Sequence, residues 1–181
     1  MPRGEPCLST TDAQRLTTCL EAIADPTSES RWAALDQLKY FCDGANAALL
    51  EAIGGKRFST IAVLLELLDN TAKLGGPIAV RKAPPSKRIP VALVVQLLEC
   101  LLCNATSNLK PFLKMTNGIK NLVSTLSHYE ELMYDAEGPA ILDRVCNVLS
   151  YCTFYHPSTA AAIFIEAEGA PPQPDSRLCM Y

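Results

Sequence analysis

The sequence has little of what marks a membrane-spanning, secreted or catalytic chain. It has one tryptophan, two histidines and 19% charged residues, and no apolar run approaches the roughly 18 residues that a membrane helix needs. Its first residues lack the apolar stretch of a secretory signal and the arginine- and serine-rich pattern of a transit peptide. Phosphate-binding loops and the GxGxxG, HExxH and GxSxG motifs are also missing. We therefore expect a non-enzymatic protein with no membrane span, no metal and no cofactor.

The composition favours a folded chain in a reducing compartment. Its 181 residues are 49% hydrophobic, enough to bury a sizeable core in one domain or one short repeat array. The net charge of −3 argues against a chain built wholly to coat nucleic acid. Most of the eight cysteines lie in apolar runs, as free thiols do when they pack as small core residues. We expect the cytosol, with the nucleus as the alternative.

Apolar residues recur with helical spacing along most of the chain, and no alternating strand pattern is present. Asp25-Pro26, Asp43-Gly44 and Gly54-Gly55 separate the first segments. The pattern predicts about nine helices, near residues 10–24, 30–42, 46–53, 61–68, 90–104, 107–115, 118–127, 140–153 and 157–167.

Two stretches between these segments are expected to be irregular loops. Residues 70–89 contain Gly75-Gly76, Pro77 and Pro84-Pro85, and residues 128–139 are irregular and acidic. The first stretch has no acidic residue and carries a charge of +5, from Lys73, Arg81, Lys82, Lys87 and Arg88. This basic loop is a candidate contact for acidic proteins, nucleic acid or anionic lipid, and the alternative is a solvated insertion. The proline-bearing tail, 171–181, is expected to be disordered.

Three segments share one order of features: a long apolar helix, a polar turn, a short helix and a glycine. They cover residues 35–55, 99–118 and 146–170. Their glycines, Gly55, Gly118 and Gly169, lie 63 and 51 residues apart, against roughly 40–47 for helical repeats of this kind. The two irregular stretches account for the excess, so the spacing fits a repeat array with two insertions.

This order resembles the armadillo repeat. The most family-like piece is the glycine-isoleucine-x-x-leucine-valine-x-x-leucine pattern at 118–126, and the run 166–170 is similar to the family's glutamate-alanine-glycine-alanine turn. The resemblance covers about residues 33–170. It implies an all-α fold, an armadillo-type right-handed α-solenoid of about three irregular repeats, forming a single domain over residues 1–170.

The resemblance also implies a binding groove, because in armadillo arrays the stacked long helices line a concave face. Aligning Leu38, Leu102 and Leu149 places nine residues along this face: Trp32, Asp36, Tyr40, Gln96, Cys100, Asn104, Asp143, Asn147 and Tyr151. Polar amides there would hold a ligand backbone and aromatic rings would anchor it. The expected function is a protein–protein scaffold or adaptor that binds an extended peptide or a partner helix. The tryptophan-and-asparagine ladder of nuclear-import receptors is not reproduced.

Other interpretations stay open. Trp32 and Tyr40 could pack between repeats instead of binding a ligand. The prolines after Gly169-Ala170 leave the last repeat without a capping helix, so the chain could be a subunit that docks, or self-associates, through this end. Cys100-x-x-Cys103 has the spacing of a zinc or redox pair, but no second pair stands at ligand spacing, and core packing is favoured.

Overall fold

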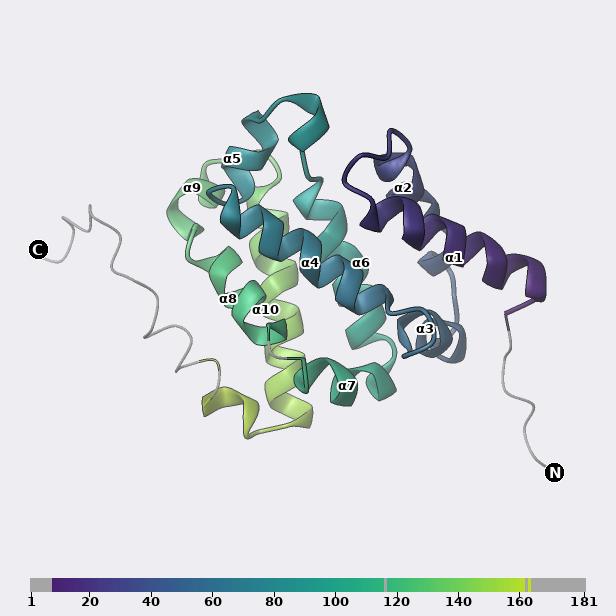
Figure 1. Ribbon diagram of the computed structural model, residues 1–181. Helices are drawn as coiled ribbons and strands as arrows, with labels where there is room; N and C mark the ends of the chain where they lie inside the picture. Colours follow the sequence, from purple (N-terminus) through teal and green to yellow (C-terminus); the bar gives the residue numbers. More distant parts are fainter. Residues whose placement is uncertain (1–7, 116, 162, 164–181) are drawn as a thin grey trace, which may run out of the picture.

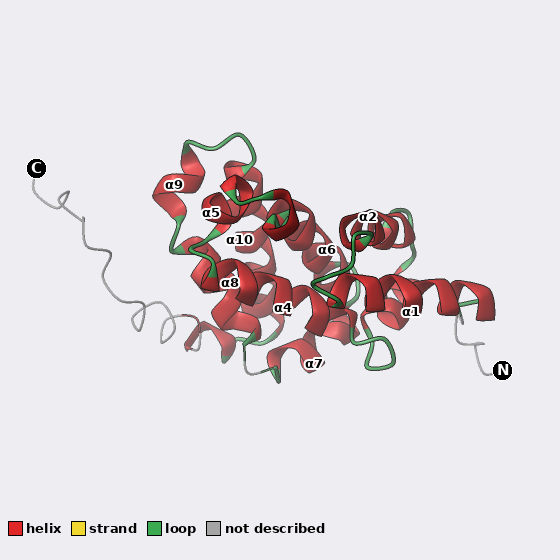
Figure 2. Ribbon diagram, turned by 45° about the horizontal axis from the view of Figure 1, so that its top comes forward, coloured by secondary structure: helices red, strands yellow, loops and turns green. Residues whose placement is uncertain are grey.

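The computed structural model describes residues 8–115, 117–161 and 163, and it confirms an all-α protein: within this part of the chain there are helices and no strands (Figures 1 and 2). The elements, in chain order, are α1 (Thr10–Ala24), α2 (Arg31–Cys42), α3 (Ala47–Gly54), α4 (Thr60–Lys73), α5 (Pro77–Lys82), η1 (Pro85–Lys87), α6 (Val91–Cys103), η2 (Thr106–Asn108), α7 (Leu109–Leu113), α8 (Gly118–Leu126), α9 (Tyr129–Met133) and α10 (Gly138–Tyr155).

Local sequence explains how the first helices begin. The Ser9 hydroxyl accepts the backbone N–H of Asp12 at 3.1 Å, and the Asn46 side chain accepts that of Leu49 at 2.9 Å. Both are N-terminal caps of the usual kind, since the first N–H groups of a helix have no partner within it. The apolar stripe of α1, with Leu16 and Ile23 fully buried, then fixes which side of that helix faces the core.

The helices pack in pairs that form two rows. α1 pairs with α2, α4 with α6, and α8 with α10. The first members, α1, α4 and α8, also contact one another in that order, as do α2, α6 and α10. α6 is central, because it contacts α2, α3, α4 and α10, and its buried side chains include Val94, Leu98 and Leu102 (Figure 1).

Two buried asparagines join neighbouring pairs. The Asn108 amide donates to the carbonyls of Leu50 at 3.1 Å and Leu101 at 3.0 Å, which ties α3 to the end of α6. The Asn121 amide donates to the carbonyl of Leu65 at 2.9 Å, which ties α8 to α4. Each amide satisfies a backbone group inside the core, where an unpaired carbonyl would be costly.

The expectation that residues 70–89 form a loop without helix is wrong. α4 continues to Lys73, and α5 and η1 lie within the stretch. Pro77 begins α5 rather than breaking a helix, because the first helical position needs no N–H partner, and Gly76 before it takes a positive φ of 97°. The second stretch, 128–139, likewise holds α9 and the first turn of α10.

These two stretches pack against each other. α5 contacts α9, and the Arg81 guanidinium pairs with the carboxylate of Asp135 and reaches Glu137 at 4.0 Å. The Asp135 side chain is only 8% exposed, so this ion pair is partly desolvated. The basic stretch, 70–89, and the acidic stretch, 128–139, are therefore joined by helix packing and by an ion pair. The last predicted helix, 157–167, extends beyond the described residues, and Gly169 and the tail 171–181 lie outside them.

Candidate functional site

A polar hollow of about 220 Å³ lies where α2, α6 and α10 meet, and we call it the central hollow. Its lining side chains come from α2 (Lys39, Cys42 and Asp43), from α6 (Gln96, Leu97, Glu99, Cys100, Cys103 and Asn104) and from α10 (Arg144). Three consecutive helices of one row thus contribute to a single surface depression.

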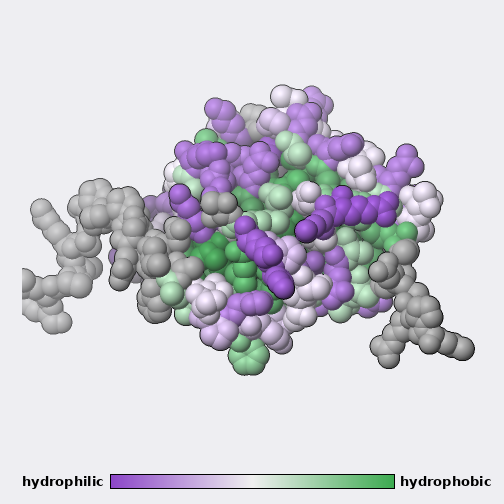
Figure 3. Space-filling model, turned by 60° about the horizontal axis from the view of Figure 1, so that its bottom comes forward, coloured by the Kyte–Doolittle hydropathy of each residue, from purple (hydrophilic) through white to green (hydrophobic). Residues whose placement is uncertain are grey.

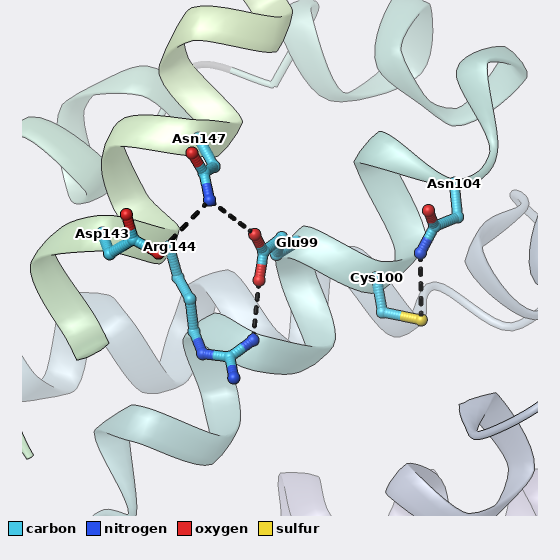
Figure 4. A network of polar contacts seen from close by, with 6 residues as sticks. All are labelled: Glu99, Cys100, Asn104, Asp143, Arg144 and Asn147. Carbon is cyan, nitrogen blue, oxygen red and sulfur yellow. Dashed lines mark hydrogen bonds and ion pairs between the residues drawn. The ribbon is translucent and has the colours of Figure 1, made fainter.

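Ionic contacts hold the two sides of the central hollow (Figure 4). Glu99 of α6 accepts from Arg144 Nη1 at 2.7 Å and from Asn147 Nδ2 at 3.0 Å, and Asn147 lies 3.5 Å from the carboxylate of Asp143. On the opposite side, Lys39 pairs with Asp43 one turn along α2. The four charged side chains that line the hollow are therefore paired, whereas Asp143, beside the α10 edge, has no cationic partner within the described residues.

Amide side chains lie between these edges. The Gln96 side chain makes no hydrogen bond within the described part of the chain, and the Asn104 side-chain amide donates only to the sulfur of Cys100, at 3.8 Å. Sulfur is a weak acceptor, and the side-chain oxygen of Asn104 accepts no hydrogen bond within the described residues. Both side chains keep capacity for hydrogen bonds to a ligand.

Two cysteines meet on the floor of the central hollow. The Cys100 thiol donates to the backbone carbonyl oxygen of Cys42 at 4.0 Å. The neighbouring Cys42 side chain lowers the pKa of Cys100 to about 6, and the same interaction raises the pKa of Cys42. Burial raises the pKa of Cys103 to about 11. The pKa values of the two thiols in the Cys100-x-x-Cys103 pair are thus shifted in opposite directions.

The structure brings together some of the residues that the sequence assigns to a groove. Gln96, Cys100 and Asn104 line the central hollow, and Asp143 and Asn147 belong to the polar network at its α10 edge.

The four remaining groove candidates lie elsewhere. Tyr40 is 82% exposed and lines a different hollow, of about 800 Å³, between α1 and α2. Trp32 packs partly against the core, with the Arg31 guanidinium 5.0 Å from its ring, and Asp36 is exposed. The Tyr151 ring packs against that of Tyr155 at a tilt of 50°, with ring centroids 4.6 Å apart.

Sequence reasoning missed Cys42 and the four charged residues that line the central hollow, Lys39, Asp43, Glu99 and Arg144. Lys39 and Asp43 carry a signal, because opposite charges four residues apart pair on a helix. Glu99 and Arg144 are 45 positions apart, and Cys42 and Cys100 are 58 apart, so no local pattern predicts that they meet.

The basic stretch is partly neutralised. Besides the pairing of Arg81 with Asp135, Lys73 pairs with Asp69 on α4, and Arg88 Nε donates to the carbonyl of Ala83 at 2.9 Å. Lys82 and Lys87 are exposed. Two of the five cations are therefore paired with carboxylates, and three, Lys82, Lys87 and Arg88, have no acidic partner within the described residues.

Large apolar side chains are exposed near the end of α10. Phe154 is 77% exposed and Tyr155 is 47% exposed, with ring centroids 5.0 Å apart. On the face shown in Figure 3, hydrophilic side chains lie across exposed hydrophobic surface. We call Tyr151, Phe154 and Tyr155 the aromatic end.

Within the described residues, no three or more histidine, cysteine or acidic side chains gather as a metal ion would require. In the same part of the chain no single helix is long and apolar enough to cross a membrane; only α6 and the segment Thr106–Leu113 pass by length and composition when taken together, and they are bent by 103°.

Comparisons with models of protein families, with curated proteins and with solved structures find no match to this chain.

Proposed function

We propose that the chain is a short armadillo-type right-handed solenoid and a non-enzymatic protein-binding module, with an extended peptide or a partner helix lying in the central hollow. The two rows of helices support the fold, since armadillo arrays stack repeated helix pairs in this way. The observation that carries the binding proposal is the pair of amides, Gln96 and Asn104, that line the hollow with unused hydrogen-bonding capacity.

The spacing of the two amides suits an extended ligand. They lie eight residues apart, Gln96 within α6 and Asn104 at its C-terminal cap, which corresponds to about 12 Å along the helix axis at about 1.5 Å per residue. An extended peptide advances about 3.3 Å per residue, so about four ligand residues span that distance. Each amide can donate to and accept from a peptide backbone.

The charges of the central hollow indicate the chemistry of the ligand. Lys39 is paired with Asp43, and Arg144 with Glu99, so the charges that line the hollow balance one another. Strongly charged ligands gain little from such edges, because each approach meets both signs. The favoured partner is a polar, weakly charged peptide segment.

A peptide-display selection on the purified chain tests this proposal. Selected peptides should bind the variant Gln96→Ala/Asn104→Ala about tenfold or more weakly than the wild type, since two backbone hydrogen bonds of about 1 kcal/mol each are lost. Fluorescence polarisation measures the change. Lys120→Ala is the matched control, because Lys120 is exposed on α8, in the other row.

Equal binding of the selected peptides to the wild type and to the double variant would contradict the proposal. Circular dichroism must show that the double variant keeps its helicity and that its Tm moves by no more than about 4 °C, roughly the effect of 1 kcal/mol. A larger shift would mean that the amides support the fold rather than a ligand.

The aromatic end supports a second candidate, a subunit that docks or self-associates through α10. Exposed aromatic rings are typical anchors of protein interfaces, and Phe154 is 77% exposed. Light scattering over a range of concentrations should then show a dimer that Phe154→Ser disrupts. A monomer at the highest concentration would count against self-association.

The basic stretch supports an anion-binding adaptor less well, because Arg81 and Lys73 already have acidic partners.

A further inference from the structure

Cys42 and Cys100 come from different helices and meet at the central hollow. Cys42 is the last residue of α2 and its side chain is buried, whereas Cys100 lies in the second half of α6 and is partly exposed. The Cys100 thiol donates to the backbone carbonyl of Cys42 at 4.0 Å, and the Asn104 amide donates to the Cys100 sulfur at 3.8 Å. The more accessible sulfur therefore faces the hollow, with the buried sulfur beside it.

The surroundings favour the thiolate form of Cys100. The neighbouring Cys42 side chain lowers the pKa of Cys100 most, burial raises it, and the Asn104 amide, which donates to Cys100 Sγ at 3.8 Å, lowers it further. The charged and titratable groups that face this position are Lys39 and Asp43 of α2, Glu99 and Cys103 of α6, and Arg144 of α10. Asp43 and Glu99 oppose the thiolate, but each is paired with a cation.

We infer that Cys100 and Cys42 form a peroxide-reactive thiol pair, in which Cys100 is the attacking nucleophile and Cys42 is the resolving thiol. Thiolate character and access decide which cysteine a peroxide oxidises, and Cys100 combines the two. A second thiol in contact then converts the oxidised sulfur into a disulfide rather than leaving it for further oxidation.

The reaction balances with a hydroperoxide as the oxidant. The Cys100 thiolate attacks the peroxide, an S–O bond forms as the O–O bond breaks, and the alkoxide or hydroxide that leaves takes a proton. The Cys42 sulfur then attacks Cys100 Sγ, an S–S bond forms as the S–O bond breaks, and the departing hydroxide takes the Cys42 proton as water. Two thiols are oxidised by two electrons, and one peroxide is reduced to an alcohol, or to water, with a second water released.

The other described cysteines lack this combination. Burial raises the pKa of Cys19 to about 11 and that of Cys152 to about 12, so both stay protonated at neutral pH. Cys146 is exposed on α10 but makes no hydrogen bond within the described residues. If exposure alone decided reactivity, Cys146 would react before Cys100.

Mass spectrometry of the full wild-type chain tests the inference without any substitution. The reduced protein is treated with one equivalent of hydrogen peroxide, free thiols are alkylated, and the digest is searched for cross-linked peptides. The expected product links the peptide that contains Cys42 to the one that contains Cys100 and Cys103, and fragmentation places the bond at Cys100. A bond at Cys103, or oxidation of Cys146 ahead of Cys100, would overturn the inference.

Variants then separate the two roles. Cys42→Ser keeps a hydrogen-bond donor but removes the resolving thiol, so the sulfenic acid of Cys100 should persist and be trapped by dimedone. Cys100→Ser should slow peroxide consumption at least tenfold, whereas Cys146→Ser should leave it unchanged.

In the wild type, the initial rate of peroxide consumption should reach half its plateau near pH 6, where Cys100 ionises. A rate that keeps rising through pH 8, or a Cys100→Ser variant as reactive as wild type, would refute the assignment. The result does not depend on whether the central hollow binds a peptide.

Discussion

The contact between Gly54 and Asn108 makes a sharp prediction about stability. Asn108 is 3% exposed, and its amide donates both of its protons, to Leu50 and to Leu101. A Cβ added at Gly54 would lie 2.8 Å from Asn108 Cγ, and its three nearest atoms all belong to the Asn108 side chain. Gly54→Ala must therefore push the amide away from the two carbonyls.

The expected magnitudes follow from these contacts. Asn108→Ala removes two buried hydrogen bonds and should lower the free energy of unfolding by about 2–3 kcal/mol. Gly54→Ala loses the same bonds but gains about 1 kcal/mol of helix propensity at the end of α3, so a net loss of about 1–2 kcal/mol is expected. In the Asn108→Ala background the clash is gone, and Gly54→Ala should be neutral or stabilising by up to about 1 kcal/mol. The effect of one substitution thus changes sign with the other, a coupling of about 2 kcal/mol.

Urea unfolding followed by circular dichroism measures all four proteins of this cycle. Asn117→Ala provides the matched control, because Asn117 is exposed and its side chain makes no capping hydrogen bond. Gly54→Ala should keep its full destabilising effect in that background. Additive effects of Gly54→Ala and Asn108→Ala, with unchanged m-values, would refute the packing described for α3 and α6.

Three further predictions concern other contacts. Gly138→Ala should destabilise by about 3 kcal/mol or more in thermal or urea unfolding, because the added Cβ would lie 2.5 Å from the carbonyl carbon of Leu132, a backbone group that cannot swing aside. Arg81→Ala should lower the free energy of unfolding by about 1 kcal/mol, and the loss should shrink in high salt, since the pair with Asp135 is only partly desolvated. The protein should also lose stability as the pH rises above 9, because burial raises the pKa of several thiols above their ordinary value of 9.0, so the unfolded chain releases those protons first. A urea midpoint that stays constant from pH 8 to about pH 11 would contradict this sign. The thiols concerned are Cys19, Cys103 and Cys152.

Helical periodicity was sufficient to locate most of the helices. The sequence predicts helices near residues 10–24, 30–42 and 90–104, and α1, α2 and α6 begin and end within one residue of those bounds. Such segments have long apolar stripes, and polar or glycine-bearing turns separate them, so local and tertiary preferences agree.

Proline positions explain where the prediction of irregular stretches failed. Pro77 is one of the residues that predict a loop over 70–89, and the predicted irregular stretch 128–139 ends at Pro139, yet Pro77 begins α5 and Pro139 lies in the first turn of α10. A proline inside a helix breaks it, whereas one in the first turn favours its start, and the sequence alone does not tell the two cases apart without a clear preceding cap.

The candidate site was only partly accessible to sequence reasoning. Gln96 and Asn104 share a helix, so their placement on one face follows from helical spacing. Tyr40 was aligned with Asn104, but the rotation of α2 about its own axis turns Tyr40 to the hollow beside α1 and Lys39 to the central one. That rotation is set by tertiary packing, so it cannot be predicted by aligning the leucines of the three segments.

The position of α6 limits how the protein can be divided. It contacts helices that precede it, α2, α3 and α4, and one that follows it, α10. A cut on either side of α6 therefore separates it from some of the surfaces that cover its leucines and valines, and exposes apolar area on both fragments. Unlike long repeat arrays, in which terminal units can be removed one at a time, this chain should yield no autonomous half, and its fragments would recover native structure only by reassociating with each other.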